Sequence, residues 1–238
     1  MTSKLWLSDS YLREFDARVE GVQNAKFVVL NQTAFYPEQG GQPCDFGVVK
    51  RKSDGAEFKV VFSKALGESV SHEVDHEGLL VGEEVHCVID WERRYKLMRM
   101  HSSAHVIHNV IWRKLGVLVS GNQLGLEHSR MDFDLEKFDR EILNGIEEEA
   151  NRIIAQNLDI TISFVSREEA FKNPELFRLK DKLPKALNEF RLIKIGEIDT
   201  SADGGTHVKK TGEIGRVKIT KLMNQGKNNR RIYWELEE

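Results

Sequence analysis

Two histidines separated by one helical turn are the first feature of this sequence that points to chemistry. They are His101 and His105, in the stretch HSSAH. On an α-helix, residues four apart lie on the same face with about 5 to 6 Å between their Cβ atoms, a separation at which two imidazoles can bind one metal ion. The pair supplies half of a predicted metal site, although two histidines packed in an apolar core would give the same pattern.

The segment around the two histidines has the features of a helix. Asp90 is a suitable N-cap and Gly116 a suitable C-terminal stop. Apolar residues recur between them at helical spacing, namely Leu97, Met100, Ala104, Ile111, Trp112 and Leu115. A third histidine, His108, falls beside this stripe, so the histidines alone do not decide between a core and a ligand set.

The complement to the helical pair is the motif DGGTH, far downstream. Asp203 and His207 are both acceptable zinc ligands, and Gly204 and Gly205 permit a tight backbone path between them, including positive φ values. Three histidines and one carboxylate then form a candidate metal centre. HSSAH lacks the glutamate that a zinc peptidase carries between its histidines, so activation of a metal-bound water would need another base.

A second motif, TAFYPEQGGQPCDFG, spans residues 33–47. Gly40 and Gly41 allow close approach of the backbone, and Gln42 offers both a donor and an acceptor, so we expect a shaped loop. A tight connection between strands with no chemical role is the alternative. The tripeptide GGQ also resembles the tip of peptide-chain release factors, which act on an ester at the end of a tRNA, but three residues form a weak match.

Composition limits the possible classes of protein. At 238 residues the chain can form one large domain or two small ones, and we expect two. The net charge is only −3, so binding of a nucleic acid would require a local basic face. The two cysteines, Cys44 and Cys87, are too few for a disulfide framework and do not form a CxxC pair, which favours a reducing compartment. Both are expected to be buried. No signal peptide or membrane span is predicted, and we expect a cytoplasmic protein.

The elements that must position these motifs can be read from local patterns. Residues 1–90 are predicted to be β-structure, most simply a small barrel, with strands at residues 26–32, 46–50, 57–62 and 84–89. After the histidine helix, a second helix is expected at residues 136–156, followed by a strand at 160–164 and a capping-box helix start at Ser166 and Glu169. A hairpin is expected at the C-terminus.

Two basic clusters lie in the same half of the chain as the predicted metal centre. One is the segment ELFRLKDKL between Pro174 and Pro184, expected to be a short helix. The other comprises Lys218, Lys221, Lys227, Arg230 and Arg231 on the C-terminal hairpin. Each cluster alone is typical of a solvated face, whereas both together favour contact with an RNA backbone.

Taken together, four motifs resemble a known family. They are TAFYPEQGGQPCDFG, DWERRYKLMRMHSSAHVIH, SRMDFDL and IDTSADGGTHVKKTGEIG. In this order, and over nearly the whole chain, they are similar to the AlaX alanyl-tRNA editing proteins, freestanding relatives of the editing domain of alanyl-tRNA synthetase. The length resembles the medium-sized form of that family.

The resemblance implies a hydrolase that deacylates tRNA(Ala) carrying serine, and glycine as a further substrate. It implies an α+β fold, with an N-terminal β-barrel at residues 1–90 and an α/β two-layer editing domain at residues 91–238. It also implies one zinc ion per chain bound by His101, His105 and His207. Gly40, Gly41 and Gln42 become candidates for substrate binding. Thr206, Ser103 and Gln42 are candidates for catalysis, and Thr206 and Ser103 are placed to line the aminoacyl pocket, with capping or packing as the alternative.

The fourth ligand departs from the family pattern. Family members usually have cysteine in a CGGTH motif, whereas this chain has Asp203. Both residues are singly negative when deprotonated, so the charge of a metal complex is preserved. A carboxylate is the harder donor, so we expect Asp203 to bind zinc more weakly and to admit other divalent metals more readily.

Two other classes of function stay open at the level of sequence. The editing domain of threonyl-tRNA synthetase shares the paired histidine motifs, although FYPEQGG and GGTH favour the alanine system. An RNA-binding module with a purely structural metal is the non-enzymatic alternative. Whether the metal would activate water or anchor the substrate is also left open.

Overall fold

The computed structural model describes residues 1–135, 140–177 and 188–237. Within them the chain forms two compact units, Met1–Leu97 and Met98–Glu238. The division falls inside the long helix α1 (Trp91–Leu115), and the domain boundary predicted after residue 90 lies at the start of the same helix.

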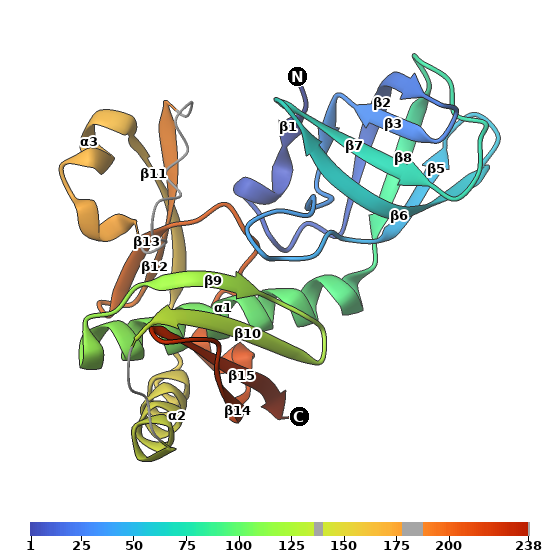
Figure 1. Ribbon diagram of the computed structural model, residues 1–238. Coiled ribbons are helices and arrows are strands. Elements are labelled where there is room, and N and C mark those ends of the chain that lie inside the picture. Colours follow the sequence, from blue (N-terminus) through green and yellow to red (C-terminus); the bar gives the residue numbers. More distant parts are fainter. Residues whose placement is uncertain (136–139, 178–187, 238) are drawn as a thin grey trace. The chain divides into compact units, whose positions relative to one another are not determined.

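A closed barrel of six antiparallel strands makes up most of the first unit (Figure 1, blue to teal). Around the barrel the order is β2-β3-β7-β6-β5-β8. The barrel strands are β2 (Glu14–Gln23), β3 (Phe27–Leu30), β5 (Gly47–Arg51), β6 (Glu57–Leu66), β7 (Ser69–Val74) and β8 (Glu84–Ile89). Two short strands, β1 (Ser3–Lys4) and β4 (Gln32–Thr33), pair in parallel beside the 3-10 turn η1 (Leu5–Leu7). The predicted α+β class with an N-terminal barrel is confirmed.

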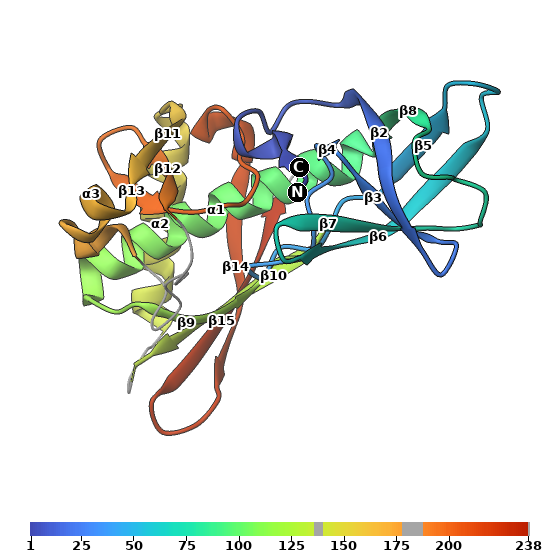
Figure 2. The same ribbon diagram turned by 90° about the horizontal axis from the view of Figure 1, so that it is seen from above.

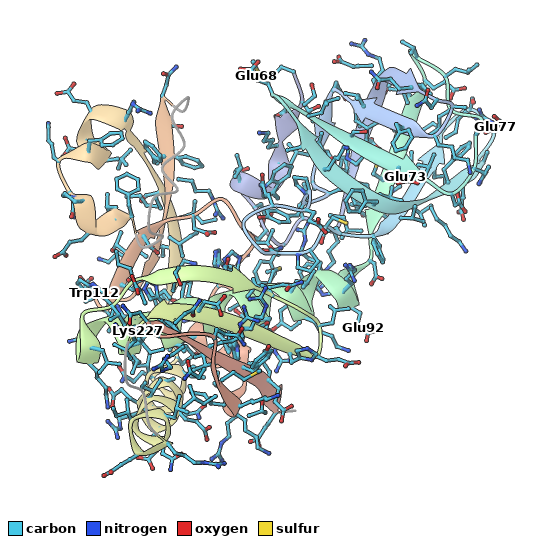
Figure 3. All side chains as sticks on the ribbon, in the orientation of Figure 1. Glu68, Glu73, Glu77, Glu92, Trp112 and Lys227 are labelled. Carbon is cyan, nitrogen blue, oxygen red and sulfur yellow. The ribbon has the colours of Figure 1, made fainter. Side chains whose placement is uncertain are left out.

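Alternation of side chains explains why these segments close into a barrel. In β2, Phe15, Ala17 and Val19 are buried while the intervening residues are exposed, which is the period-two pattern of a strand with one face in a core. Charged side chains such as Glu68 and Glu77 lie outside (Figure 3). The predicted strand at residues 84–89 matches β8, and that at 57–62 continues to Leu66.

The first unit also contains a buried ion pair. Arg94 and Asp45 form an ion pair with both side chains fully buried, and Arg94 also donates to the carbonyls of Ser10 and Ala34. Because a buried ion pair is stable only when its remaining donors and acceptors are satisfied, these bonds fix the first turn of α1 against the N-terminal segment. Both cysteines are buried, as expected, and burial raises their thiol pKa values.

Two antiparallel sheets and the remaining helices form the second unit. One sheet has the order β14-β15-β10-β9 and the other β11-β12-β13. Their strands are β9 (Val119–Gln123), β10 (His128–Asp134), β11 (Ile160–Ser166), β12 (Glu189–Ile195), β13 (Asp199–Ala202), β14 (Arg216–Asn224) and β15 (Asn229–Glu237). The predicted C-terminal hairpin is β14 with β15, the dark red pair in Figure 2.

Helix α1 begins and ends where the sequence indicates. The Arg93 N–H donates to Oδ1 of Asp90 at 3.1 Å, and Gly116 takes a φ of +67° while its N–H donates to the Trp112 carbonyl. Along the helix, Leu97, Met100 and Ile111 of the predicted stripe are buried. In the second unit, the indole N–H of Trp234 on β15 donates to Oγ of Ser103 at 2.8 Å, so the inner face of the four-stranded sheet contacts α1.

The other helices are shorter. Helix α2 spans Arg140–Ala155 in the described residues, and residues 136–139 of its predicted start lie outside them. Helix α3 (Arg167–Phe171) begins at the predicted cap, where the Glu169 N–H donates to Oγ of Ser166. The 3-10 turns are η2 (Pro174–Leu176) and η3 (Thr211–Ile214). The basic segment predicted as a helix lies outside the described residues from position 178 onwards. Among the described helices, none has the length and apolarity to cross a bilayer.

Candidate metal centre

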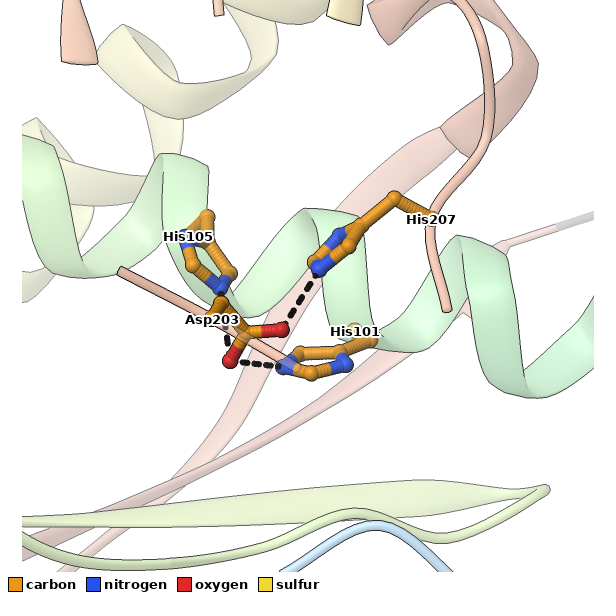
Figure 4. Close-up of side chains that lie close together, drawn as sticks. All are labelled: His101, His105, Asp203 and His207. Atoms are coloured by element: carbon orange, nitrogen blue, oxygen red, sulfur yellow. Dashed lines mark hydrogen bonds and ion pairs between the residues drawn. The ribbon is translucent and has the colours of Figure 1, made fainter. Parts of the chain in front are cut away.

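Four side chains converge inside the second unit (Figure 4). His101 and His105 project from neighbouring turns of α1, and Asp203 and His207 come from the loop that follows β13. One nitrogen or oxygen of each side chain lies within 4.8 Å of those of the other three. The helical pair and the DGGTH motif, about a hundred residues apart in sequence, are therefore brought together.

The nitrogen that each imidazole turns towards Asp203 is Nε2. Oδ1 of Asp203 lies 3.0 Å from Nε2 of His207, and Oδ2 lies 3.5 Å from that of His101 and 3.8 Å from that of His105. Ligand atoms around one tetrahedral zinc ion are separated by comparable distances, because each zinc–ligand bond is about 2.0 to 2.2 Å long. The donor set of three imidazoles and one carboxylate fits a divalent metal.

The opposite nitrogen, Nδ1, contacts a serine hydroxyl in two of the three histidines. Nδ1 of His207 lies 3.2 Å from Oγ of Ser102, and Nδ1 of His105 lies 3.1 Å from Oγ of Ser201. Metal-binding histidines generally use their second nitrogen in a hydrogen bond that fixes the ring. These contacts support a metal on the Nε2 side.

Backbone contacts hold the DGGTH turn in place. Oδ1 of Asp203 accepts the Gly205 N–H at 2.6 Å, and Nη1 of Arg191 donates to the carbonyls of Asp203 and Gly205, each at 2.9 Å. Arg191 is buried in β12, next to β13. The loop that carries two of the candidate ligands is thus fixed to the three-stranded sheet.

The reason for the glycines differs from the one that the sequence suggested. Neither Gly204 nor Gly205 has a positive φ. A Cβ atom on Gly205 would instead lie 2.2 Å from Cε1 of His101, whereas one on Gly204 would meet nothing within 4 Å. Gly205 is required because the His101 ring packs directly against its Cα.

Charge and burial act in opposite directions on these groups. Burial lowers the pKa of His105, but the nearby carboxylates of Asp199 and Asp203 outweigh it and raise the pKa to about 9. Burial raises the pKa of Asp203, but the His101 charge and the bonds from the imidazoles hold it well below its usual value. Burial and the positive charge of His101 lower the pKa of His207. A metal ion at this position would displace the proton on Nε2 of His105, the nitrogen that faces Asp203.

The other predicted site residues take different positions. Oγ of Ser103 donates to the Met100 carbonyl and accepts from Trp234, so it belongs to the packing of α1. Thr206 is fully buried between Gly205 and His207. His108 lies outside the group of four.

The GGQ motif forms a tight turn in the first unit. Gln39 and Gln42 exchange two backbone hydrogen bonds, and Gly40 and Gly41 between them have φ values of +61° and +86°. Positive φ at both central positions is the geometry of a type I′ turn, which glycine adopts without strain. The Gln42 side chain is buried and Gly40 is exposed.

Four polar residues of this centre were not foreseen, namely Ser102, Asp199, Ser201 and Arg191. Asp199, Ser201 and Asp203 alternate along and beyond β13, so a strand assignment at residues 199–203 would have placed their side chains on one face. That alternation in DTSAD was the available signal. No comparable pattern pointed to Arg191.

Comparisons with known proteins match this arrangement. A family model for the second additional domain of threonyl and alanyl tRNA synthetases matches residues 190–233, and one for class II (A) tRNA synthetases matches residues 8–93. The chain is 48% identical to the alanyl-tRNA editing protein AlaX-M of Methanosarcina mazei, over 99% of this chain and 97% of the relative. The chain belongs to the AlaX family of alanyl-tRNA editing proteins.

Other relatives show that the chain is similar in sequence to part of an aminoacyl-tRNA synthetase. The AlaX-M protein of Saccharolobus solfataricus is 38% identical over the full length of both chains. An alanine–tRNA ligase of Pyrobaculum neutrophilum is 40% identical over 93% of this chain, which corresponds to 25% of the ligase. The chain therefore resembles a part of that much longer enzyme.

The close packing of Gly205 against His101 gives a direct test of the metal centre. Gly205→Ala should weaken zinc binding by about tenfold or more, because the new methyl group must displace the His101 ring. Gly204→Ala is the matched control and should bind zinc like the parent. Zinc affinity is measured by competition with a chelating dye, and equal affinities of the two variants would contradict the assignment of His101.

Proposed function

We propose that this protein deacylates tRNA(Ala) that carries serine, with glycine as a further amino acid removed. The observation that carries the proposal is the convergence of His101, His105, Asp203 and His207 in a chain that belongs to the AlaX family. The relatives that match along their whole length are named alanyl-tRNA editing proteins. The reaction is hydrolysis of the ester between the amino acid and the terminal ribose.

In this proposal the four side chains hold one zinc ion through the three Nε2 atoms and a carboxylate oxygen of Asp203. When bound, zinc supplies a Lewis acid that can polarise an ester oxygen or lower the pKa of water. Arg191 and the Gly205 N–H keep Asp203 and the following turn in place. In this proposal the protein contributes a ligand set held by α1 and by the loop that follows β13.

Selectivity for serine requires a group that recognises its hydroxyl. Thr206 lies between Gly205 and His207, and we propose that its hydroxyl serves this purpose. A site built to hydrogen-bond a hydroxyl rejects the analogue that lacks it, so alanine would be left on its tRNA. The hydroxyl of Ser103, the other candidate for lining this pocket, bonds the Met100 carbonyl and the Trp234 indole N–H.

The partner in this proposal is tRNA(Ala). Lys218, Lys221 and Lys227 are exposed on the hairpin of β14 and β15, and cations on such a surface attract a phosphate backbone. Arg231 is less available, because it bonds Asp132 through both Nε and Nη2. We propose that the exposed lysines of this hairpin contact RNA.

The deciding experiment is deacylation of Ser-tRNA(Ala) by the full chain, with Ala-tRNA(Ala) as the substrate to be spared. His101→Ala removes a ligand, so zinc content and hydrolysis should fall together. His108→Ala is the matched control on the same helix and should retain both. Full hydrolysis by zinc-free His101→Ala would refute a zinc-dependent enzyme, and a parent protein that binds tRNA without hydrolysis would favour a binding module.

We propose that the GGQ turn takes part in binding the tRNA substrate, and that the buried Gln42 side chain maintains the shape of the turn. Gln42→Ala should change the ratio of kcat/KM for Ser-tRNA(Ala) to that for Ala-tRNA(Ala) by about tenfold, because the altered turn no longer positions the substrate. Zinc content should not change, because Gln42 and the metal ligands belong to different units. Gln39→Ala, at the exposed opposite side of the turn, is the control. Equal ratios for the two variants would leave the turn a structural connection.

The departure at position 203 sets an expectation for metal choice. A carboxylate is harder than a thiolate, so zinc should be less strongly preferred over cobalt or manganese than at a cysteine site. Asp203→Cys should raise zinc affinity and Asp203→Ala should lower it. Metal analysis after dialysis against a chelator measures both changes, and an unaltered affinity in Asp203→Ala would show that Asp203 is not a ligand.

A further inference from the structure

A second carboxylate lies behind the metal centre, on the side away from Asp203. Asp199 opens β13, and its side chain is only 4% exposed. Its Oδ2 lies 3.2 Å from Oγ of Ser201 and 3.8 Å from Nδ1 of His105, while Oδ1 lies 3.3 Å from Nδ2 of Asn109 on α1. Burying a carboxylate is costly unless its neighbours compensate, so this placement needs an explanation.

The direction of the hydrogen bonds follows from what each group can do. An ionised carboxylate only accepts, so the Ser201 hydroxyl must donate its hydrogen to Asp199. Only a lone pair of Oγ is then left for Nδ1 of His105, 3.1 Å away, so Nδ1 must carry a hydrogen. In the neutral ring the lone pair therefore lies on Nε2, the nitrogen that faces Asp203.

His207 has a different arrangement behind its ring. Oγ of Ser102 contacts Nδ1 of His207 at 3.2 Å and accepts the Val208 N–H, also at 3.2 Å. Behind His207 the serine is bonded to a neutral backbone amide, whereas behind His105 the serine is bonded to a carboxylate. The two histidines can therefore be compared within one protein.

The negative charge of Asp199 also affects the charge balance of the metal centre. A divalent cation with three neutral imidazoles and the Asp203 carboxylate carries a net charge of +1. One more carboxylate close to His105 offsets that charge in a place where water screens it poorly. Together the two carboxylates would neutralise a divalent ion.

We propose that Asp199 is a positioning residue of the metal centre, which acts through Ser201 to hold His105 with its hydrogen on Nδ1 and which balances the charge of the bound cation. The proposal rests on the ligand set of the proposed function. It assigns to Asp199 and Ser201 a role in metal affinity, and no contact with the substrate.

The test uses the full chain and zinc as the only ligand. Asp199→Asn keeps the shape and removes the charge, and Ser201→Ala removes the hydroxyl. Each should weaken zinc binding about 10- to 100-fold, the usual effect of losing such an outer partner. Thr200→Val, at the intervening position of β13, is the control and should bind zinc like the parent. Ser201→Thr retains a hydroxyl and should restore most of the affinity.

A second measurement separates positioning from simple loss of structure. In the zinc-loaded parent, long-range proton–nitrogen NMR should show the hydrogen of His105 on Nδ1, protected from exchange, and Ser201→Ala should lose that protection. Thermal unfolding in the presence of a chelator should be similar for Ser201→Ala and the Thr200→Val control.

The outcomes also distinguish this inference from the proposed function. If the parent binds zinc and hydrolyses Ser-tRNA(Ala), but Asp199→Asn and Ser201→Ala match Thr200→Val in zinc affinity, the inference is wrong and the function stands. If the parent binds no zinc, the zinc-dependent function fails first and the inference fails with it. Weaker zinc binding in both variants, with loss of exchange protection in Ser201→Ala, supports the inference.

Discussion

Holding three imidazoles and a carboxylate together in a largely buried place is the constraint on which this structure depends. Polar groups removed from water are costly unless each has a partner, and charges more so. Almost every neighbour of the centre offsets part of that cost by a hydrogen bond. Ser102 and Ser201 contact the outer nitrogens of two rings, and Arg191 takes up the carbonyls of the turn. These hydrogen bonds offset the cost of burying the four candidate ligands.

The sequence was a good guide wherever a feature was local. The spacing of His101 and His105, the cap at Asp90 and the stop at Gly116 are all set within one helix, so their patterns could be read directly. Short β-rich segments separated by turn signals likewise allowed the barrel to be predicted, although β2 and β7 were not among the predicted strands. The grouping of the helical histidines with DGGTH needed the assumption of a shared metal, because no local pattern links α1 to the loop after β13.

What escaped prediction depends on packing between distant segments. Gly205 was expected to be needed for backbone freedom, but it is needed for space beside a ring about a hundred positions earlier in the chain. Arg191 reaches the turn only because β12 pairs with β13. The local sequence of β12 does not predict the register of that pairing. Buried polar partners of this kind are specified by tertiary structure, so a single sequence gives them little signal.

The aspartate at position 203 differs from a cysteine in more than hardness. Oδ1 accepts the Gly205 N–H and lies 3.0 Å from Nε2 of His207, while Oδ2 faces His101 and His105. A lone sulfur atom would have to serve both the turn and the ion, or leave the amide to another acceptor. An aspartate in this loop therefore ties the shape of the backbone to the presence of the charge, so the loop can hold its conformation before any cation arrives. If Asp203 binds the proposed metal, one side chain would both preorganise this loop and act as a ligand.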